Sequence, residues 1–179
     1  MKEKISDEKF EELVDKQILE YVKKGNPKLW HQMAMEWSWD SSSVFLNWLV
    51  DNPKTDKATA LLIYWKSAPR YWKKFLDKDD LISKEDYGLA DFEFVEKVEN
   101  NILNDFYQES NFEFDPKNDE QNYDWTNDYA DEITVRNIPN ILFEKIEGQK
   151  VKEPENFIEG MPPELYEMQD ELYEKYDIE

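Results

Sequence analysis

The chain has 179 residues, of which 40% are hydrophobic, 15% aromatic and 36% charged, and it contains no Cys. The absence of Cys excludes disulfides, zinc fingers and thiol catalysis. No apolar run approaches the ~20 residues of a transmembrane helix, and the first residues form no apolar signal region, so we expect a cytoplasmic protein.

The negative charge is concentrated in the second part of the chain. Residues 1–78 hold 12 acids and 14 bases, whereas residues 79–179 hold 30 acids and 8 bases, and the net charge is −20. Such a chain lacks the basic surface that contact with nucleic acid requires. It favours a basic protein partner that is attracted electrostatically. The alternative is that the acidity only keeps the protein soluble.

Four helices are predicted in the first part of the chain. Apolar residues recur at three- and four-residue intervals over 7–24, 27–37 and 44–51, as on one face of a helix. The fourth helix, over 56–65, is apolar nearly all round, which predicts the buried centre of a small bundle. The side chains expected to cap these four helices are Ser6 or Asp7, Asn26, Asp40 to Ser43, and Thr55 or Asp56.

Further helices are predicted over 69–76, over 89–106, over 139–147 and from Pro162 onward. Pro opens three of these segments, and Pro suits the first turn of a helix because its missing N–H would have no partner there. Residues 77–88 are charged and contain Ser and Gly, which predicts a connection without regular structure.

Two short segments favour strands over helices. Residues 111–116 alternate between apolar and polar side chains, and residues 133–135 are β-branched. We therefore predict a mostly α fold with at most one short β-hairpin. A Trp-rich helical bundle over 1–78 forms the core, and an acidic, loop-rich extension over 79–179 packs on it to make a single structural unit.

A set of Trp-containing motifs marks residues 30–72. The motifs are Trp30-His31, Trp37-Ser38-Trp39-Asp40, Trp48 followed by Asn52-Pro53, and the stretch from Asp56 to Trp65. This pattern resembles an uncharacterised bacterial family, the domain of unknown function 4274. The chain departs from the family pattern at Ser42 and Ala58, where Gly is expected, and both residues fit the first turn of a helix.

The resemblance implies a small helical domain and no particular activity. Some members of the family occur in settings typical of immunity proteins, which suggests an interaction rather than a reaction. The Trp residues recur at helical spacing, which is typical of a buried core and less typical of a stacking surface for bases or sugars.

No catalytic residue is predicted. His31 is the only His, and Ser38, Asp40 and Ser41–Ser43 follow it closely. Closeness in sequence is not the geometry of a catalytic triad, and no strained nucleophile turn surrounds any of these Ser. We expect His31 to be partly buried and hydrogen-bonded within the Trp cluster.

No metal and no cofactor is predicted either. Residues 115–124 are rich in oxygen donors, but a Lys stands at the third position of a calcium loop and no Gly at the sixth. The four Gly of the chain form neither a P-loop nor a dinucleotide-binding fingerprint. With 42 acids some carboxylates must lie close together, and the sequence does not select one pair for catalysis.

The strongest functional signal lies in residues 105–132, here called the acidic segment. It holds ten acids against one base, with aromatic residues between them, including Phe112 and Phe114. Aromatic anchors and carboxylates suit binding to a basic groove, whereas a hydrated loop pinned by aromatics would look the same. The candidate partner-binding residues are Glu113, Asp115, Asp119, Glu120, Tyr123, Asp124, Trp125, Asp128, Tyr129 and Asp131.

The sequence therefore leads to the hypothesis of a non-enzymatic acidic binding protein. In this hypothesis it is an immunity protein or inhibitor that neutralises a basic bacterial toxin by blocking its active cleft. Two alternatives remain open at this point. One is a hydrolase that uses an unrecognised carboxylate with His31, and the other is an adaptor for a secreted effector.

Overall fold

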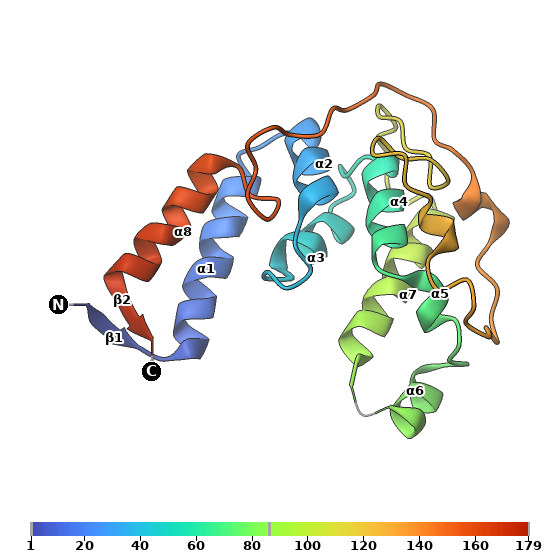
Figure 1. Ribbon diagram of the computed structural model, residues 1–179, viewed down its shortest axis with the longest axis horizontal. Coiled ribbons are helices and arrows are strands. Elements are labelled where there is room, and N and C mark those ends of the chain that lie inside the picture. The colour runs from blue at the N-terminus through green and yellow to red at the C-terminus, as the bar shows by residue number, and fades with distance from the viewer. Residues whose placement is uncertain (1, 86, 179) are drawn as a thin grey trace. The chain divides into compact units, whose positions relative to one another are not determined.

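The computed structural model describes residues 2–85 and 87–178 of the chain. Over these residues the protein has eight α-helices, two short 3-10 helices and one sheet of two strands (Figure 1). The chain divides into two compact units. The terminal unit consists of Met1–Asp51 and Lys152–Glu179, and the central unit consists of Asn52–Val151. The mostly α fold expected from the sequence is confirmed.

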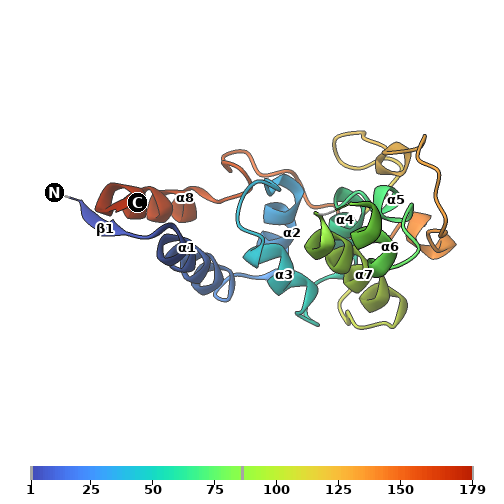
Figure 2. The same cartoon turned by 90° about the horizontal axis from the view of Figure 1, so that it is seen from below.

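The terminal unit brings the first and last segments of the chain together. Its elements are β1 (Glu3–Ile5), α1 (Asp7–Val22), α2 (Pro27–Glu36), α3 (Val44–Val50), α8 (Pro163–Lys175) and β2 (Tyr176–Ile178). The two strands pair in parallel, with Lys4 opposite Asp177, and α1 packs against both α3 and α8. Both views show α1 and α8 side by side (Figures 1 and 2).

The prediction of a β-hairpin from residues 111–116 and 133–135 is wrong. The sheet is parallel and joins the two ends of the chain, and parallel strands cannot be connected by a tight turn. Phe114 instead forms an isolated bridge with Ile146. Residues 133–135 do not pair with residues 111–116 in a hairpin. The backbone N–H of Val135 instead donates to the carbonyl of Lys73 over 3.0 Å.

The central unit is built around a helix that is buried on all sides. Its elements are α4 (Lys57–Lys66), α5 (Pro69–Trp72), α6 (Lys78–Lys84), α7 (Leu89–Leu103) and the 3-10 helices η1 (Trp125–Asn127) and η2 (Asn140–Phe143). Every residue of α4 from Ala58 to Trp65 is buried. The longer helix α7 packs on α4. The prediction that this apolar helix forms the centre of a bundle is confirmed.

Three predicted helix caps are confirmed. The side chains of Ser6, Asn26 and Asp56 each accept a hydrogen bond from a backbone N–H in the first turn of α1, α2 and α4. Asp56 also accepts the backbone N–H of Asn111 over 2.6 Å, which fixes the loop after α7 to the start of α4. Burial raises the pKa of Asp56, although these N–H groups oppose the rise.

A buried ionic network joins the helices of the central unit. The Nζ of Lys73 lies 2.8 Å from Glu99 and 3.1 Å from Glu96. Glu99 also accepts the hydroxyl of Tyr64, and Glu96 pairs with Arg136 over 2.8 Å. Burial raises the pKa of Tyr64 above its usual 10.0, so this hydroxyl keeps its proton and donates it to the hydrogen bond.

Two segments differ from the predicted secondary structure. Residues 77–88 contain α6, because the side chain of Asp77 accepts the backbone N–H of Asp80 and starts a helix. Residues 139–147 form only the short η2, because Ile146 is held in an extended bridge that a longer helix would break.

Most of the Trp-rich stretch is core, as its helical spacing predicts. Trp30, Trp37, Trp65 and Trp72 are all buried. Two Trp residues of the stretch are exceptions: Trp48 is half-buried, and Trp39, which follows the end of α2, is 44% exposed. The four buried Trp residues therefore stabilise the packing of the helices and are not available as a stacking surface.

The compact units do not follow the charge boundary between residues 78 and 79. That boundary lies inside the central unit, at the start of α6. Helices α4 and α5 precede the boundary, α7 follows it, and α7 packs against both. Along the residues that the structure describes, no helix is both long and apolar enough to cross a membrane.

Candidate functional site

The acidic segment is held in shape by its own carboxylates. Asp119 accepts hydrogen bonds from the backbone N–H groups of Gln121 and Tyr123, at 2.8 and 2.9 Å. Its second oxygen accepts the indole N–H of Trp125 over 2.7 Å. A backbone hydrogen bond between the N–H of Asp119 and the carbonyl of Tyr123 closes the loop. Asp119 is therefore the centre of an ordered loop.

Two further acids of the segment have similar structural roles. Asp124 caps η1 by accepting the backbone N–H and the hydroxyl of Thr126, and it also accepts the amide of Asn127. Asp128 accepts the hydroxyl of Tyr123. This hydrogen bond raises the pKa of the Tyr123 phenol above its usual 10.0.

The remaining acidic candidates have other surroundings. Glu113 lies 3.3 Å from the Nζ of Lys145 and 3.6 Å from that of Lys150, and Glu120 lies 3.7 Å from the same Lys150. Asp115 accepts the N–H of the residue two positions later. Asp131 is exposed and lines a hollow of about 470 Å³ together with residues near the ends of α5 and α6.

The aromatic residues of the acidic segment divide into two groups. Phe112 and Phe114 are buried, so they belong to the core of the central unit and cannot reach a partner. Tyr123 and Tyr129 are 45% and 49% exposed. Trp125 is half-buried, and its ring packs edge-on against Tyr123 at a centroid distance of 4.7 Å. The exposed Tyr side chains are the aromatic anchors that the segment offers.

The structure also contains a site that the sequence did not reveal. A cavity of about 640 Å³ lies in the terminal unit between α1, α8 and the loops around residues 37–43 and 159–161. We call it the acidic cavity, because five of its lining residues are carboxylates and none of the described lining residues is basic. These carboxylates are Glu11, Asp15, Asp40, Glu159 and Asp170.

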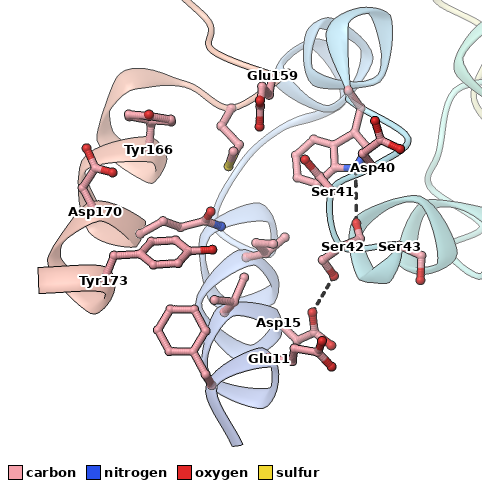
Figure 3. A pocket seen from close by; sticks show the side chains of 16 residues that line it. Glu11, Asp15, Asp40, Ser41, Ser42, Ser43, Glu159, Tyr166, Asp170 and Tyr173 are labelled. Atoms are coloured by element: carbon pink, nitrogen blue, oxygen red, sulfur yellow. Dashed lines mark hydrogen bonds between the residues drawn. The ribbon is translucent and has the colours of Figure 1, made fainter. Parts of the chain in front are cut away.

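Figure 3 shows how the walls of the acidic cavity are arranged. Tyr166, Asp170 and Tyr173 come from α8, whereas Glu11 and Asp15 come from α1 and lie on the side of the loop that carries Asp40 and Ser41–Ser43. The hydroxyl of Ser42 donates to Asp15 over 2.5 Å, and this contact ties the loop before α3 to α1. Apolar side chains complete the lining, namely Phe10, Val14, Ile18, Trp37 and Met161.

A tight turn positions one carboxylate of the acidic cavity. Ile158 and Met161 pair in an antiparallel bridge, and the two residues between them, Glu159 and Gly160, both have positive φ. Such values are typical of the type I′ turn. The carbonyl of Glu159 accepts the backbone N–H of Ser38, which holds the turn against the loop after α2.

Sequence reasoning missed this cavity because its walls come from the two ends of the chain. Glu11 and Asp15 are four residues apart on α1 and so share a face, which is the one signal that the sequence carries. That signal is common on solvated helices and does not identify a cavity. The partner wall on α8 lies far away in sequence, and no motif links the two.

His31 does not take part in the acidic cavity. It is only 3% exposed and is not one of the lining residues, whereas Asp40 is. Burial lowers the pKa of His31 to about 4, so the imidazole is neutral at neutral pH. The acidic cavity therefore does not join His31 to Asp40, an arrangement that would have favoured the hydrolase alternative.

Metal binding finds no support in the arrangement of side chains. Among the residues that the structure describes, no three His, Asp or Glu side chains are grouped so that they could hold a metal ion. In the loop at 115–124, the oxygens of Asp119 and Asp124 accept hydrogen bonds from backbone N–H groups, from the Trp125 indole and from the Thr126 hydroxyl.

Comparison with known proteins identifies a domain family. No curated protein matches the chain, and no solved structure does. Residues 25–103 match the family described as Domain of unknown function (DUF4274), and the match extends beyond residues 30–72 at both ends. It begins just before α2 and ends with α7, so it includes the Trp-rich helices. Of the buried ionic network it includes Lys73, Glu96 and Glu99 but not Arg136. The chain therefore contains a DUF4274 domain over residues 25–103.

Proposed function

We propose that this protein is a non-enzymatic acidic binding protein that captures a basic protein in the cytoplasm. In its most specific form, the proposal is an immunity protein or inhibitor that neutralises a basic bacterial toxin by covering its active cleft. A chain with a net charge of −20 attracts a basic partner over long range and speeds their encounter.

The observation that carries the proposal is the ordered loop around Asp119. Its carboxylate fixes three donors of the same loop, while Tyr123 and Tyr129 remain about half exposed. A binding surface that is already ordered loses less conformational entropy when the complex forms. Exposed Tyr side chains are frequent anchors of protein interfaces, and carboxylates around them select a basic partner.

The acidic cavity supports the same class of partner by separate means. Its five carboxylates and apolar lining suit the side chain of a Lys or an Arg, which has an aliphatic stem and a cationic head. Its volume of about 640 Å³ lies within the range of ~300–1,000 Å³ that ligand pockets occupy. The cavity is the second place at which a basic protein can be held.

A binding experiment with charge-reversed variants tests the proposal. The partner is first isolated from the source organism by pull-down with the full chain, and its affinity is then measured by calorimetry. Reversal of Asp119, Asp124 or Asp128 would also remove hydrogen bonds of the loop, so the cleaner variant is Glu120→Lys with Asp131→Lys. The matched control is Asp91→Lys with Glu93→Lys on α7, where both side chains are exposed and which changes the net charge equally.

We expect the first variant to bind the basic partner about tenfold more weakly or worse, and to lose part of the salt dependence of binding. The control should bind as the wild type does at the same salt concentration. Equal loss in both variants would reduce the effect to overall charge and would refute the role of the acidic segment. Capture of an acidic partner would refute the proposal as a whole.

A further inference from the structure

Both Arg residues of the chain lie at the same cavity. The sequence contains 22 basic residues, of which only Arg70 and Arg136 are Arg. A cavity of about 290 Å³ in the central unit is lined by both of them, although 65 residues separate them in sequence. None of the described residues that line it is acidic, in a chain that has 42 acids. Its polar lining is completed by Thr134, Asn137 and Asn140.

The charge of Arg136 is already balanced. Its Nη1 pairs with Glu96 over 2.8 Å, and its Nε donates to the carbonyl of Phe75 over 2.7 Å. Together with Lys73 and Glu99, these groups form the buried ionic network, which holds two positive and two negative charges. Arg136 is therefore a fixed wall of the cavity, and its charge is not available to a ligand.

Arg70 is in a different situation. Its Nη2 donates to the carbonyl of Thr126 over 2.6 Å, but its Nε is buried and has no hydrogen-bond partner. Among the described residues, no carboxylate lies within 4.0 Å of its guanidinium nitrogens. A guanidinium keeps its charge at every pH at which proteins fold, and a buried donor without a partner is unfavourable. An anion bound at the Nη groups would balance the charge of Arg70.

We propose that this cavity binds a single carboxylate group, carried by a small organic acid or by a polypeptide. The two Nη groups of a guanidinium form a fork that matches the two oxygens of a carboxylate. The buried ionic network is neutral, so the charge that a ligand can balance is that of Arg70, and one carboxylate balances it. A phosphate dianion would bring a second negative charge that Arg70 alone does not balance. This proposal is independent of the acidic segment and of the capture of a basic partner.

Nuclear magnetic resonance can test the site directly. With two Arg in the chain, the spectrum of a ¹⁵N-labelled sample holds two Nε–Hε signals, and they report on the cavity separately. Acetate should shift the signal of Arg70 until it saturates, while that of Arg136 stays in place because its Nε–H is bonded to Phe75. N-acetylglycine and inorganic phosphate are titrated in parallel, and chloride at equal ionic strength serves as the control.

Variants separate the site from general charge effects. Arg70→Lys keeps the charge but loses the fork, and it should bind acetate about tenfold more weakly or worse, as measured on the backbone amides around Asn140. Lys54→Gln removes an exposed positive charge of the same unit and should bind as the wild type does. If Arg70→Lys does not fold, Asn140→Asp is used instead, since an acid in the lining should weaken acetate binding.

Three outcomes would overturn the proposal. The first is a shift of the Arg70 signal that does not saturate or that chloride reproduces. The second is unchanged binding of acetate in Arg70→Lys or Asn140→Asp. The third is stronger binding of inorganic phosphate than of either carboxylate, which would assign the cavity to a phosphate group. A stronger response to N-acetylglycine than to acetate would favour a polypeptide as the source of the carboxylate.

Discussion

The Nζ of Lys73 lies 2.8 Å from Oε1 of Glu99, and the two side chains are only 2% and 11% exposed. Lys73 follows the end of α5, and Glu99 lies on α7, so this pair connects two helices of the central unit. Glu99 also accepts the hydroxyl of Tyr64 on α4, which brings a third helix into the contact. The pair therefore fixes how the helices of this unit pack.

Removing one member of the pair should destabilise the protein strongly. Lys73→Met leaves Glu99 buried without its cation, and such a loss typically costs about 3–5 kcal/mol. Urea denaturation at neutral pH measures the free energy of unfolding. The double variant Lys73→Met with Glu99→Gln should recover part of the loss, because no uncompensated charge stays buried. A single variant as stable as the wild type would show that the pair is not needed.

The neighbouring Glu96 should make stability sensitive to acid. Burial alone would raise the pKa of this carboxyl, but hydrogen bonds and charges from Arg136 and Lys73 outweigh burial and hold the pKa below its usual 4.5. A group whose pKa is lowered on folding stabilises the protein above its unfolded pKa. That stabilisation is lost as the pH falls through the lower, folded value.

We therefore expect the free energy of unfolding to decrease below pH 4.5, and Glu96→Gln to make this decrease smaller. The control is Glu93→Gln on the same helix, whose side chain is exposed. Urea denaturation of the three proteins over a series of acidic pH values gives the comparison. Identical acid dependence in the wild type and in Glu96→Gln would contradict the prediction.

Local signals in the sequence predicted much of the helical fold. Ser6, Asn26 and Asp56 are read as caps because a cap depends on residues only a few positions away. The burial of α4 follows from its apolar circumference. The parallel pairing of β1 with β2 could not be predicted, because three-residue strands at opposite ends of a chain leave no periodic pattern.

The candidate sites show a similar limit. Composition identified the acidic segment but could not distinguish a carboxylate that holds backbone N–H groups, such as Asp119, from one that faces solvent, such as Asp131. The acidic cavity and the Arg-lined cavity both depend on contacts between distant segments. For Arg70 and Arg136, the rarity of Arg was visible in the sequence, but their meeting at one cavity was not.

His31 should titrate well below an ordinary His. Its burial lowers the pKa from 6.5 to about 4 in the folded protein. Folding therefore favours the neutral form of the imidazole. The stability that His31 contributes in this form is fully present above pH 6.5. As the pH falls from 6.5 towards the folded value, up to about 1.4 kcal/mol is lost per pH unit.

The single His of the chain makes this prediction simple to check. The chemical shift of its ring protons is followed by NMR during an acid titration of the folded protein, and again in concentrated urea. We expect midpoints near pH 4 and near pH 6.5, respectively. A folded-state midpoint near 6.5 would show that the imidazole is open to water, and this would revive its candidacy as a catalytic base.

Loss of the Asp119 carboxylate should loosen the acidic segment. Asp119→Ala leaves three donors without their acceptor, namely the N–H groups of Gln121 and Tyr123 and the indole of Trp125. Hydrogen exchange of these three protons should become faster than in the wild type. Glu120→Ala removes the same charge from an exposed position and should leave their exchange unchanged. Equal protection in Asp119→Ala and the wild type would mean that the loop does not depend on this carboxylate.

Gly160 should not tolerate a side chain. Its φ of 84° favours glycine, and a Cβ at this position would lie 2.4 Å from the Cα of Trp37. Gly160→Ala must therefore displace backbone as well as adopt a strained conformation, which costs at least about 1 kcal/mol for the backbone alone. We expect a lower melting temperature by calorimetry, and a change in the environment of Glu159 in the acidic cavity.

Gly25→Ala provides the control for this substitution. A Cβ there would meet side-chain atoms of Leu29 and Trp30 at 3.0 Å, and a side chain can move more easily than backbone. The loss of stability in Gly25→Ala should therefore be smaller than in Gly160→Ala. If the two variants melted at the same temperature, the turn at Glu159 would not be held rigidly against Trp37, and one wall of the acidic cavity would be free to move.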